Sequence, residues 1–140
     1  LLAKAAVIGA YIKRRGNLMF IGEKSNVTDT AELSACLEES FANLELMGVE
    51  CAIDIPGKNS IYTRDAIHVY DFFEAVTEAA MDDLHFVWLK ARSLEDAVIF
   101  NLQAESKADL SALSALADTC ACEDGVWRFS LRIGKAGEKA

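Results

Sequence analysis

The chain has 140 residues, of which 52% are apolar and 26% are charged, and its formal net charge at pH 7 is −8. This length and balance predict one globular domain with a buried core rather than a disordered segment. The acidic balance argues against nucleic acid and anionic membrane as partners, and the basic cluster at residues 13–15 is too short to change that. No apolar run approaches the roughly 18 to 20 residues that cross a bilayer, so we expect no membrane contact by this chain.

The four cysteines do not have the spacing of a zinc site. Cys120 and Cys122 form a C-x-C pair, whereas Cys36 and Cys51 lie far away in apolar patterns, and zinc knuckles use paired C-x-x-C-like spacing. We interpret the cysteines as small buried thiols in a reducing environment and expect a cytoplasmic protein. The chain begins at Leu1 without an initiator Met, which favours a piece of something longer.

The first third of the chain predicts a helix, a short strand and a second helix. Residues 1–16 carry a helical apolar pattern, and the apolar run at 18–21 has the length of a strand. Asp29 followed by Glu32 predicts a capping box at the start of the next helix, which Gly48 ends. The apolar residues of that helix recur at helical spacing: Leu33, Cys36, Leu37, Phe41 and Leu44.

A strand at 49–55 ends at Pro56-Gly57, and a long helix follows over 64–83. One face of this helix is apolar and must face the core: Val69, Phe72, Phe73, Val76 and Ala80. The opposite face carries carboxylates at steps of three or four residues: Asp71, Glu74, Glu78 and Asp82. The plain interpretation of this stripe is a solvated helix face. Because like charges at these steps destabilise a helix, the alternative is a surface for a cation or a basic partner.

The last third predicts strands at 86–91 and 98–102, a short helix at 108–118 and a final hairpin. Asp124-Gly125 is the favoured two-residue type I′ turn. The residues after it alternate between apolar and polar, and the apolar ones are Trp127, Phe129, Leu131 and Ile133. The order of elements predicts an α/β (α+β) two-layer sandwich, with helices on one face of a mixed, largely antiparallel sheet.

We expect the helices near 31–47 and 64–82 to pack side by side on that face. The side chains expected to be buried together are Leu37, Phe41, Phe72, Phe73, Val76, Trp127, Phe129 and Leu131.

This order resembles the ATPase domain of the GHKL superfamily, in particular that of bacterial sensor histidine kinases. Residues 32–55 resemble the first long helix of that domain and the strand after it. The segment F-E-A-V-T-E-A at 73–79 resembles the N-box helix, and residues 124–127 resemble the hairpin that closes the sheet. Residues 11–15 resemble the end of the dimerisation helices that lead into the ATPase domain.

The resemblance implies three parts in the chain: the end of a dimerisation or linker region at 1–16, a histidine-kinase-like ATPase domain at 17–137 and a frayed tail at 138–140. It implies ATP and Mg²⁺ as ligands, and a response regulator or other signalling protein as partner. It also implies a homodimer in the parent protein. The apolar stripe of the first helix is then a self-association surface or is loosely packed.

The resemblance assigns roles to three carboxylates, with departures. Glu74 holds the acidic position of the N-box, which assists the γ-phosphate chemistry, and Glu78 stands where the family has the Asn that ligates Mg²⁺. Glu105 is the acidic candidate for nucleotide contact in the segment 103–109, where the family has a D-x-G-x-G motif. That segment has no glycine, and residues 110–119 lack the glycine-rich lid motif.

Two interpretations of function follow, from different classes. The first is a degenerate ATP-binding domain of a cytoplasmic sensor histidine kinase, a transferase by resemblance, with weak or no ATP binding. The second is a non-catalytic protein–protein docking domain that keeps the fold. An unrelated α/β binding domain stays open as a third. Neither His68 nor His85 has the sequence context of a phosphoacceptor, and we interpret each as an ordinary helix-flank or strand-edge residue.

Overall fold

The computed structural model describes residues 26–136. The helix expected at 1–16, the strand expected at 18–21 and the tail at 138–140 lie outside the described residues. The elements, in chain order, are β1 (Val27–Asp29), α2 (Thr30–Leu46), β2 (Glu50–Asp54), β3 (Ser60–Tyr62), α3 (Thr63–Ala80), the 3-10 helix η1 (Met81–Asp83), β4 (Phe86–Ser93), β5 (Ala97–Glu105), the 3-10 helix η2 (Ser111–Leu116), β6 (Thr119–Glu123) and β7 (Val126–Gly134).

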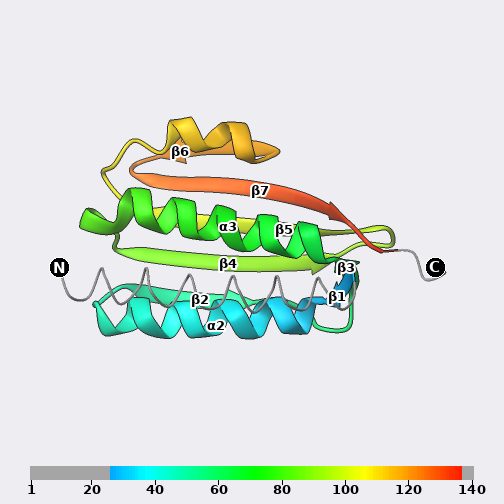
Figure 1. The fold of residues 1–140 in the computed structure, drawn as a ribbon. Coiled ribbons are helices and arrows are strands. Elements are labelled where there is room, and N and C mark those ends of the chain that lie inside the picture. Colours follow the sequence, from blue (N-terminus) through cyan, green and yellow to red (C-terminus); the bar gives the residue numbers. More distant parts are fainter. Residues whose placement is uncertain (1–25, 137–140) are drawn as a thin grey trace.

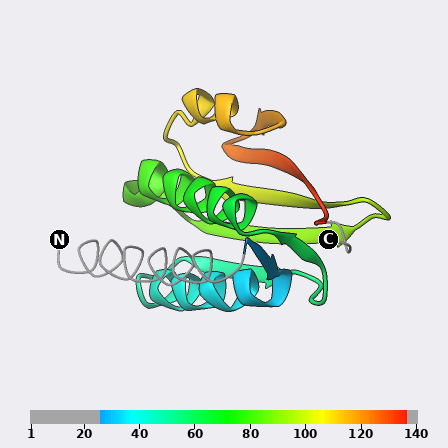
Figure 2. The ribbon, with the colours of Figure 1, turned by 45° about the vertical axis from the view of Figure 1, so that its right-hand side comes forward.

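The centre of the fold is a five-stranded sheet with the strand order β2-β4-β5-β7-β6. β2 pairs with β4 in parallel, and all other neighbours in this sheet are antiparallel. The helices α2 and α3 lie on one face of the sheet (Figures 1 and 2), which confirms the predicted two-layer sandwich on a mixed sheet. None of the helices between residues 26 and 136 is long and apolar enough to cross a membrane.

Both ends of α2 are fixed by residues that the sequence singled out. Asp29 is the N-cap, and its Oδ1 accepts hydrogen bonds from the backbone N–H of Ala31 at 2.7 Å and of Lys58 at 2.9 Å. The expected capping box requires the N–H of Glu32 to donate to the Asp29 side chain. In the structure the N–H of Ala31 donates instead. Gly48 ends the helix with a φ of +89°, as predicted. The N–H of Gly48 donates to Glu45 and that of the next residue to Leu44, a Schellman arrangement.

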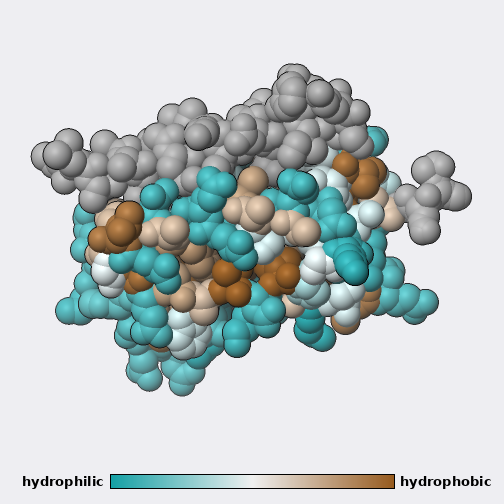
Figure 3. All heavy atoms as spheres, turned by 90° about the horizontal axis from the view of Figure 1, so that it is seen from below, coloured by the Kyte–Doolittle hydropathy of each residue, from teal (hydrophilic) through white to brown (hydrophobic). Residues whose placement is uncertain are grey.

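The core lies between the two helices and the sheet. The rings of Phe41 on α2 and Phe73 on α3 stack with centroids 5.0 Å apart. Phe72 of α3 meets Phe129 of β7 edge to face at 5.2 Å. The residues expected to be buried together are buried, except Trp127, which is half-buried against the core. On the side of α2, the surface is mostly hydrophilic with scattered apolar side chains (Figure 3).

The final hairpin has the predicted turn, because both Asp124 and Gly125 have positive φ, at 54° and 81°. The sequence did not predict the small antiparallel pair of β1 and β3. Each of these strands has three residues, which is too short to show an alternating pattern.

We expect Gly48→Ala to lower the free energy of unfolding by about 1 to 2 kcal/mol, because Ala is strained at a left-handed φ. No neighbouring atom lies within 4 Å of the position of the added Cβ, so the cost comes from the backbone alone. Urea denaturation measures the change. Gly134→Ala is the matched control, since its Cβ also meets open space at an ordinary φ. Equal stabilities of the two variants would contradict this account of the helix end.

Candidate functional site

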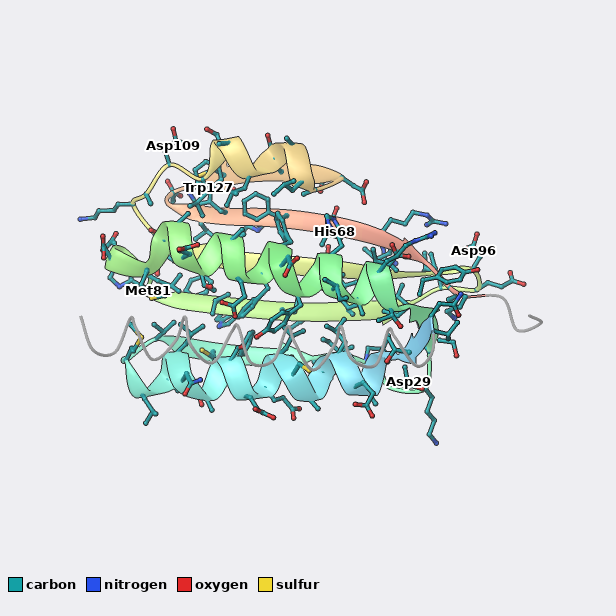
Figure 4. The ribbon with its side chains drawn as sticks, in the orientation of Figure 1. Asp29, His68, Met81, Asp96, Asp109 and Trp127 are labelled. Atoms are coloured by element: carbon teal, nitrogen blue, oxygen red, sulfur yellow. The ribbon has the colours of Figure 1, made fainter. Side chains whose placement is uncertain are left out.

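The carboxyl-terminal ends of α3 and β5 lie at the same end of the sandwich. η1 connects α3 to the start of β4, and the antiparallel register places Phe86 of β4 beside Glu105 of β5. Met81, Asp109 and Trp127 mark this end in Figure 4. The resemblance expects the nucleotide here, between the N-box helix and the segment that follows β5.

Hydrogen bonds hold the first residues after β5 on two sides. The Oδ2 of Asp83 accepts the backbone N–H of Lys107 at 2.8 Å, which ties the segment to η1. The N–H of Ser106 donates to the carbonyl of Gly125 at 3.0 Å, which ties it to the β6–β7 turn. Ser106 is buried, and its Oγ accepts the N–H of Ala108 at 3.1 Å. The segment therefore leaves β5 along a defined path.

The segment then enters the core. Leu110 is 1% exposed and belongs to the core cluster, and Leu113 packs against that cluster. The predicted helix at 108–118 is the shorter 3-10 helix η2. Asp109 accepts the N–H of Ser111 at 3.0 Å just before η2, and hydrogen bonds from Ser111 lower the pKa of Asp109. In this region Leu110 is buried, whereas η2 contains no buried residue and Leu116 is 47% exposed.

The interface between α3 and the sheet is closed. The cavity there has a volume of only about 10 Å³, and Phe72, Phe73, Phe100 and Phe129 are among the residues that line it. This is at the lower limit of the space that one water molecule needs.

Glu74 does not lie on a solvated face, so the expected position of the acidic stripe is wrong for this residue. It is 9% exposed, and its Oε1 accepts a hydrogen bond from Ser40 Oγ of α2 at 3.2 Å. The Ser40 hydroxyl is also hydrogen-bonded to the hydroxyl of Tyr70, at 2.9 Å. The physical reason is that α3 packs against both the sheet and α2, so its buried arc is wider than the apolar stripe alone.

The other two predicted carboxylates lie elsewhere. Glu78, the proposed Mg²⁺ ligand, is exposed on α3. Glu105 is half-buried, and its side chain lies on the face of the sheet away from the helices, because Leu102 and Ala104 of β5 face the core. The structure therefore does not bring Glu74, Glu78 and Glu105 together.

No group of three or more His, Cys, Asp or Glu side chains that could hold a metal occurs among residues 26–136. His68 is exposed on α3 (Figure 4). The Nε2 of His85 lies 3.2 Å from Asp83 Oδ1 at the surface. The sequence analysis missed Asp83, Ser106 and Lys107, since their pairing is long-range and leaves no local pattern.

The architecture matches solved structures of histidine kinases and of a bacterial phosphotransferase. The histidine kinase AdeS of Acinetobacter baumannii is 11% identical, with a TM-score of 0.59, over 97% of this chain and 82% of that chain. A bacterial phosphotransferase is 9% identical, with a TM-score of 0.63, over 92% and 73%. The isolated catalytic domain of the histidine kinase ThkA is 11% identical, with a TM-score of 0.51, over 81% and 99%. The fold is that of a histidine kinase catalytic domain.

The histidine kinase ThkA has also been solved in complex with the response regulator protein TrrA, with a TM-score of 0.52 at 11% identity over 92% of this chain and 49% of that chain. No protein-family model matches the sequence, and no curated protein sequence matches it. At 9–11% identity, the similarity to histidine kinase catalytic domains establishes the fold and not the activity.

We expect the backbone amide of Lys107 to report the ionisation of Asp83. The hydrogen bond from that amide, followed by the charges of His85 and Lys107, holds the pKa of Asp83 below its ordinary value. Because the folded-state pKa is lowered, the stabilising effect of the carboxylate is present above the ordinary Asp pKa of about 3.9 and is lost as the pH falls through the folded-state pKa.

An NMR titration that follows the Lys107 amide measures this pKa, and the expected midpoint lies below about 3.9. The titration should be absent in Asp83→Asn and retained in Asp82→Asn, a change in the same turn. An unchanged titration of Lys107 in Asp83→Asn would show that this contact does not form in solution.

Proposed function

We propose that this chain is the catalytic-fold domain of a two-component signalling protein, that it binds ATP weakly or not at all, and that it serves to contact other signalling proteins. The observation that carries the proposal is the closed segment after β5, in which Leu110 is buried and the nearby backbone amides are already bonded. In the resembling family, the same region approaches the nucleotide.

The backbone around this segment supports the loss of phosphate binding. Backbone N–H groups bind phosphate only where they are unengaged and the chain can approach closely. Here the N–H groups of Lys107, Ala108 and Ser111 already donate to Asp83, Ser106 and Asp109 within the chain. Without a glycine between residues 103 and 118, a rearrangement that frees them is costly.

Charge supports the same conclusion. The carboxylates of Asp83 and Asp109 lie beside the segment after β5, and a triphosphate that approached this segment would meet their negative charge.

The residues present do not fit a Mg²⁺–ATP complex. Glu74 is turned to Ser40 of α2, and Glu105 lies on the opposite face of the sheet, so only Glu78 of these three is exposed on α3. Mg²⁺ prefers hard oxygen ligands in octahedral geometry, and one surface carboxylate supplies too few of them.

The solved structures with a similar fold support one class of partner protein. One of them is a histidine kinase in complex with a response regulator protein, and another is named a phosphotransferase. We therefore propose a response regulator or another two-component protein as the partner. The homodimer of the parent protein stays a prediction, since residues 1–16 lie outside the described residues.

Isothermal titration calorimetry with ATP and Mg²⁺ tests the proposal. We expect no binding tighter than about 1 mM, because no phosphate-binding backbone or Mg²⁺ ligand set is available. A dissociation constant in the micromolar range that Glu78→Ala abolishes and Glu38→Ala leaves unchanged would contradict the proposal and restore a working ATP-binding domain. Glu38 is a matched control, since it is an exposed glutamate on α2.

Mg²⁺ alone is the second titrant. Binding of Mg²⁺ that is lost in Glu74→Gln would indicate a remnant metal site within the same fold. The absence of both ATP and Mg²⁺ binding is the result that the docking function predicts.

A further inference from the structure

The edge strand β6 carries two of the four cysteines. Its only neighbour in the sheet among residues 26–136 is β7 (Figure 1). Successive side chains of a strand point to opposite faces, so Cys120 and Cys122 share one face. Their partners in register are Phe129, which is buried in the core, and Trp127, which packs against the core. The two thiols therefore lie on the face of the sheet that bears the helices.

Both thiols are within reach of solvent. The expectation of buried thiols is wrong for Cys122, which is exposed, and Cys120 is half-buried. The physical reason is that an edge strand has a neighbour on one side only, and that the residues of η2 beside it are not buried themselves. Neither cysteine forms a disulfide.

The spacing of the pair does not allow a disulfide between the two cysteines, but it fits a metal bridge. Two residues of a strand advance about 6.7 Å, whereas a disulfide needs Cβ atoms about 3.5 to 4.5 Å apart. A metal ion with two thiolate bonds of about 2.3 Å in a line spans about 4.6 Å between the sulfur atoms. Each sulfur lies one bond beyond its Cβ, so two thiols that lean toward each other along the strand reach this distance.

The number and kind of ligands select the ion. No group of three or more His, Cys, Asp or Glu side chains that could hold a metal occurs between residues 26 and 136. A structural zinc site needs four ligands, and Mg²⁺ needs hard oxygen ligands. Two thiolates are soft ligands, which favour Cu(I), and this ion accepts two sulfur ligands in a line.

We propose that Cys120 and Cys122 form a binding site for Cu(I). As the two copper–sulfur bonds form, each thiol gives its proton to the solvent, and the resulting group carries one negative charge. No electron is transferred, because the copper enters as Cu(I) and stays in that state. The site is independent of the docking function proposed above.

The other two cysteines cannot join this site. β2 and β6 are the two edges of the five-stranded sheet, about 19 Å apart across four strand spacings. The thiol of Cys51 in β2 donates to the carbonyl of Phe41 at 3.7 Å, and burial raises the pKa of this thiol to about 12. Cys36 belongs to α2, which lies beside β2 (Figure 1). These two cysteines are therefore controls within the same chain.

Trp127 provides a local signal for the site (Figure 4). A two-residue turn joins β6 to β7, so Glu123 and Val126 form the hydrogen-bonded pair that closes the turn. Cys122 and Trp127 are then a non-hydrogen-bonded pair, whose side chains lie closer together. A metal ion at the thiols should therefore quench the fluorescence of Trp127. The only other tryptophan, Trp88, alternates with core residues of β4 and lies on the opposite face.

The probe is Cu(I), titrated without oxygen into the folded Trp88→Phe chain in competition with the Cu(I) chelator bicinchoninate. We expect one Cu(I) per chain, quenching of Trp127 and an unchanged sedimentation coefficient. Circular dichroism shows that each variant is folded.

Cys120→Ser and Cys122→Ser should each weaken Cu(I) binding at least about 100-fold, because the second thiol of a pair acts at a high effective concentration. Cys36→Ser and Cys51→Ser are the matched controls and should leave the affinity unchanged. Equal affinities of the native chain and either β6 serine variant would overturn the proposal, and so would a sedimentation coefficient that shows two chains for each Cu(I).

A double variant separates the position of the thiols from their number. Cys120→Ser/Ala121→Cys keeps two thiols on β6 but places them on opposite faces of the strand, since Ala121 is exposed on the face away from the helices. This variant should bind Cu(I) no more tightly than Cys120→Ser alone. Native-like affinity of the double variant would show that any two thiols suffice and would contradict the assigned site.

Discussion

Leu110 is buried in the core although it lies in the segment that leaves β5, and this packing constrains the rest of the carboxyl-terminal half. The segment cannot move away without exposing a Leu side chain, at a cost of about 1.5 to 3 kcal/mol. The hydrogen bonds of Lys107 to Asp83 and of Ser106 to Gly125 hold the preceding residues in the same position. The start of the segment after β5 is therefore held by one buried leucine and by these two hydrogen bonds.

The helix α3 is held by packing on two sides. Its aromatic residues fill the space above the sheet, and its other side lies against α2, where Phe41 and Phe73 stack. Glu74 is on that second side and is hydrogen-bonded to Ser40. A carboxylate that is held between two helices by a hydroxyl group contributes to the packing of α2 on α3.

Much of the fold could be predicted from local patterns. The apolar spacing of α2 and α3, the Gly48 end of α2 and the Asp124-Gly125 turn are each determined by residues close in sequence, and all are found in the structure. The orientation of Glu74 could not be predicted, because a helical wheel does not show that a second helix covers that side.

The closed end of the sandwich could be predicted only in part. The absence of glycines between residues 103 and 118 indicated a changed nucleotide region. The contact of Asp83 with Lys107 depends on how η1 and the end of β5 meet in space.

The most direct test of the central claim compares two leucines of the same segment by urea denaturation. Leu110 is buried, whereas Leu116 in η2 is 47% exposed. If the segment after β5 is part of the core, Leu110→Ala lowers the free energy of unfolding by about 2 to 5 kcal/mol. Leu116→Ala then changes it by no more than about 0.5 kcal/mol. Equal, small effects of the two substitutions would show a loosely held lid and would contradict the account.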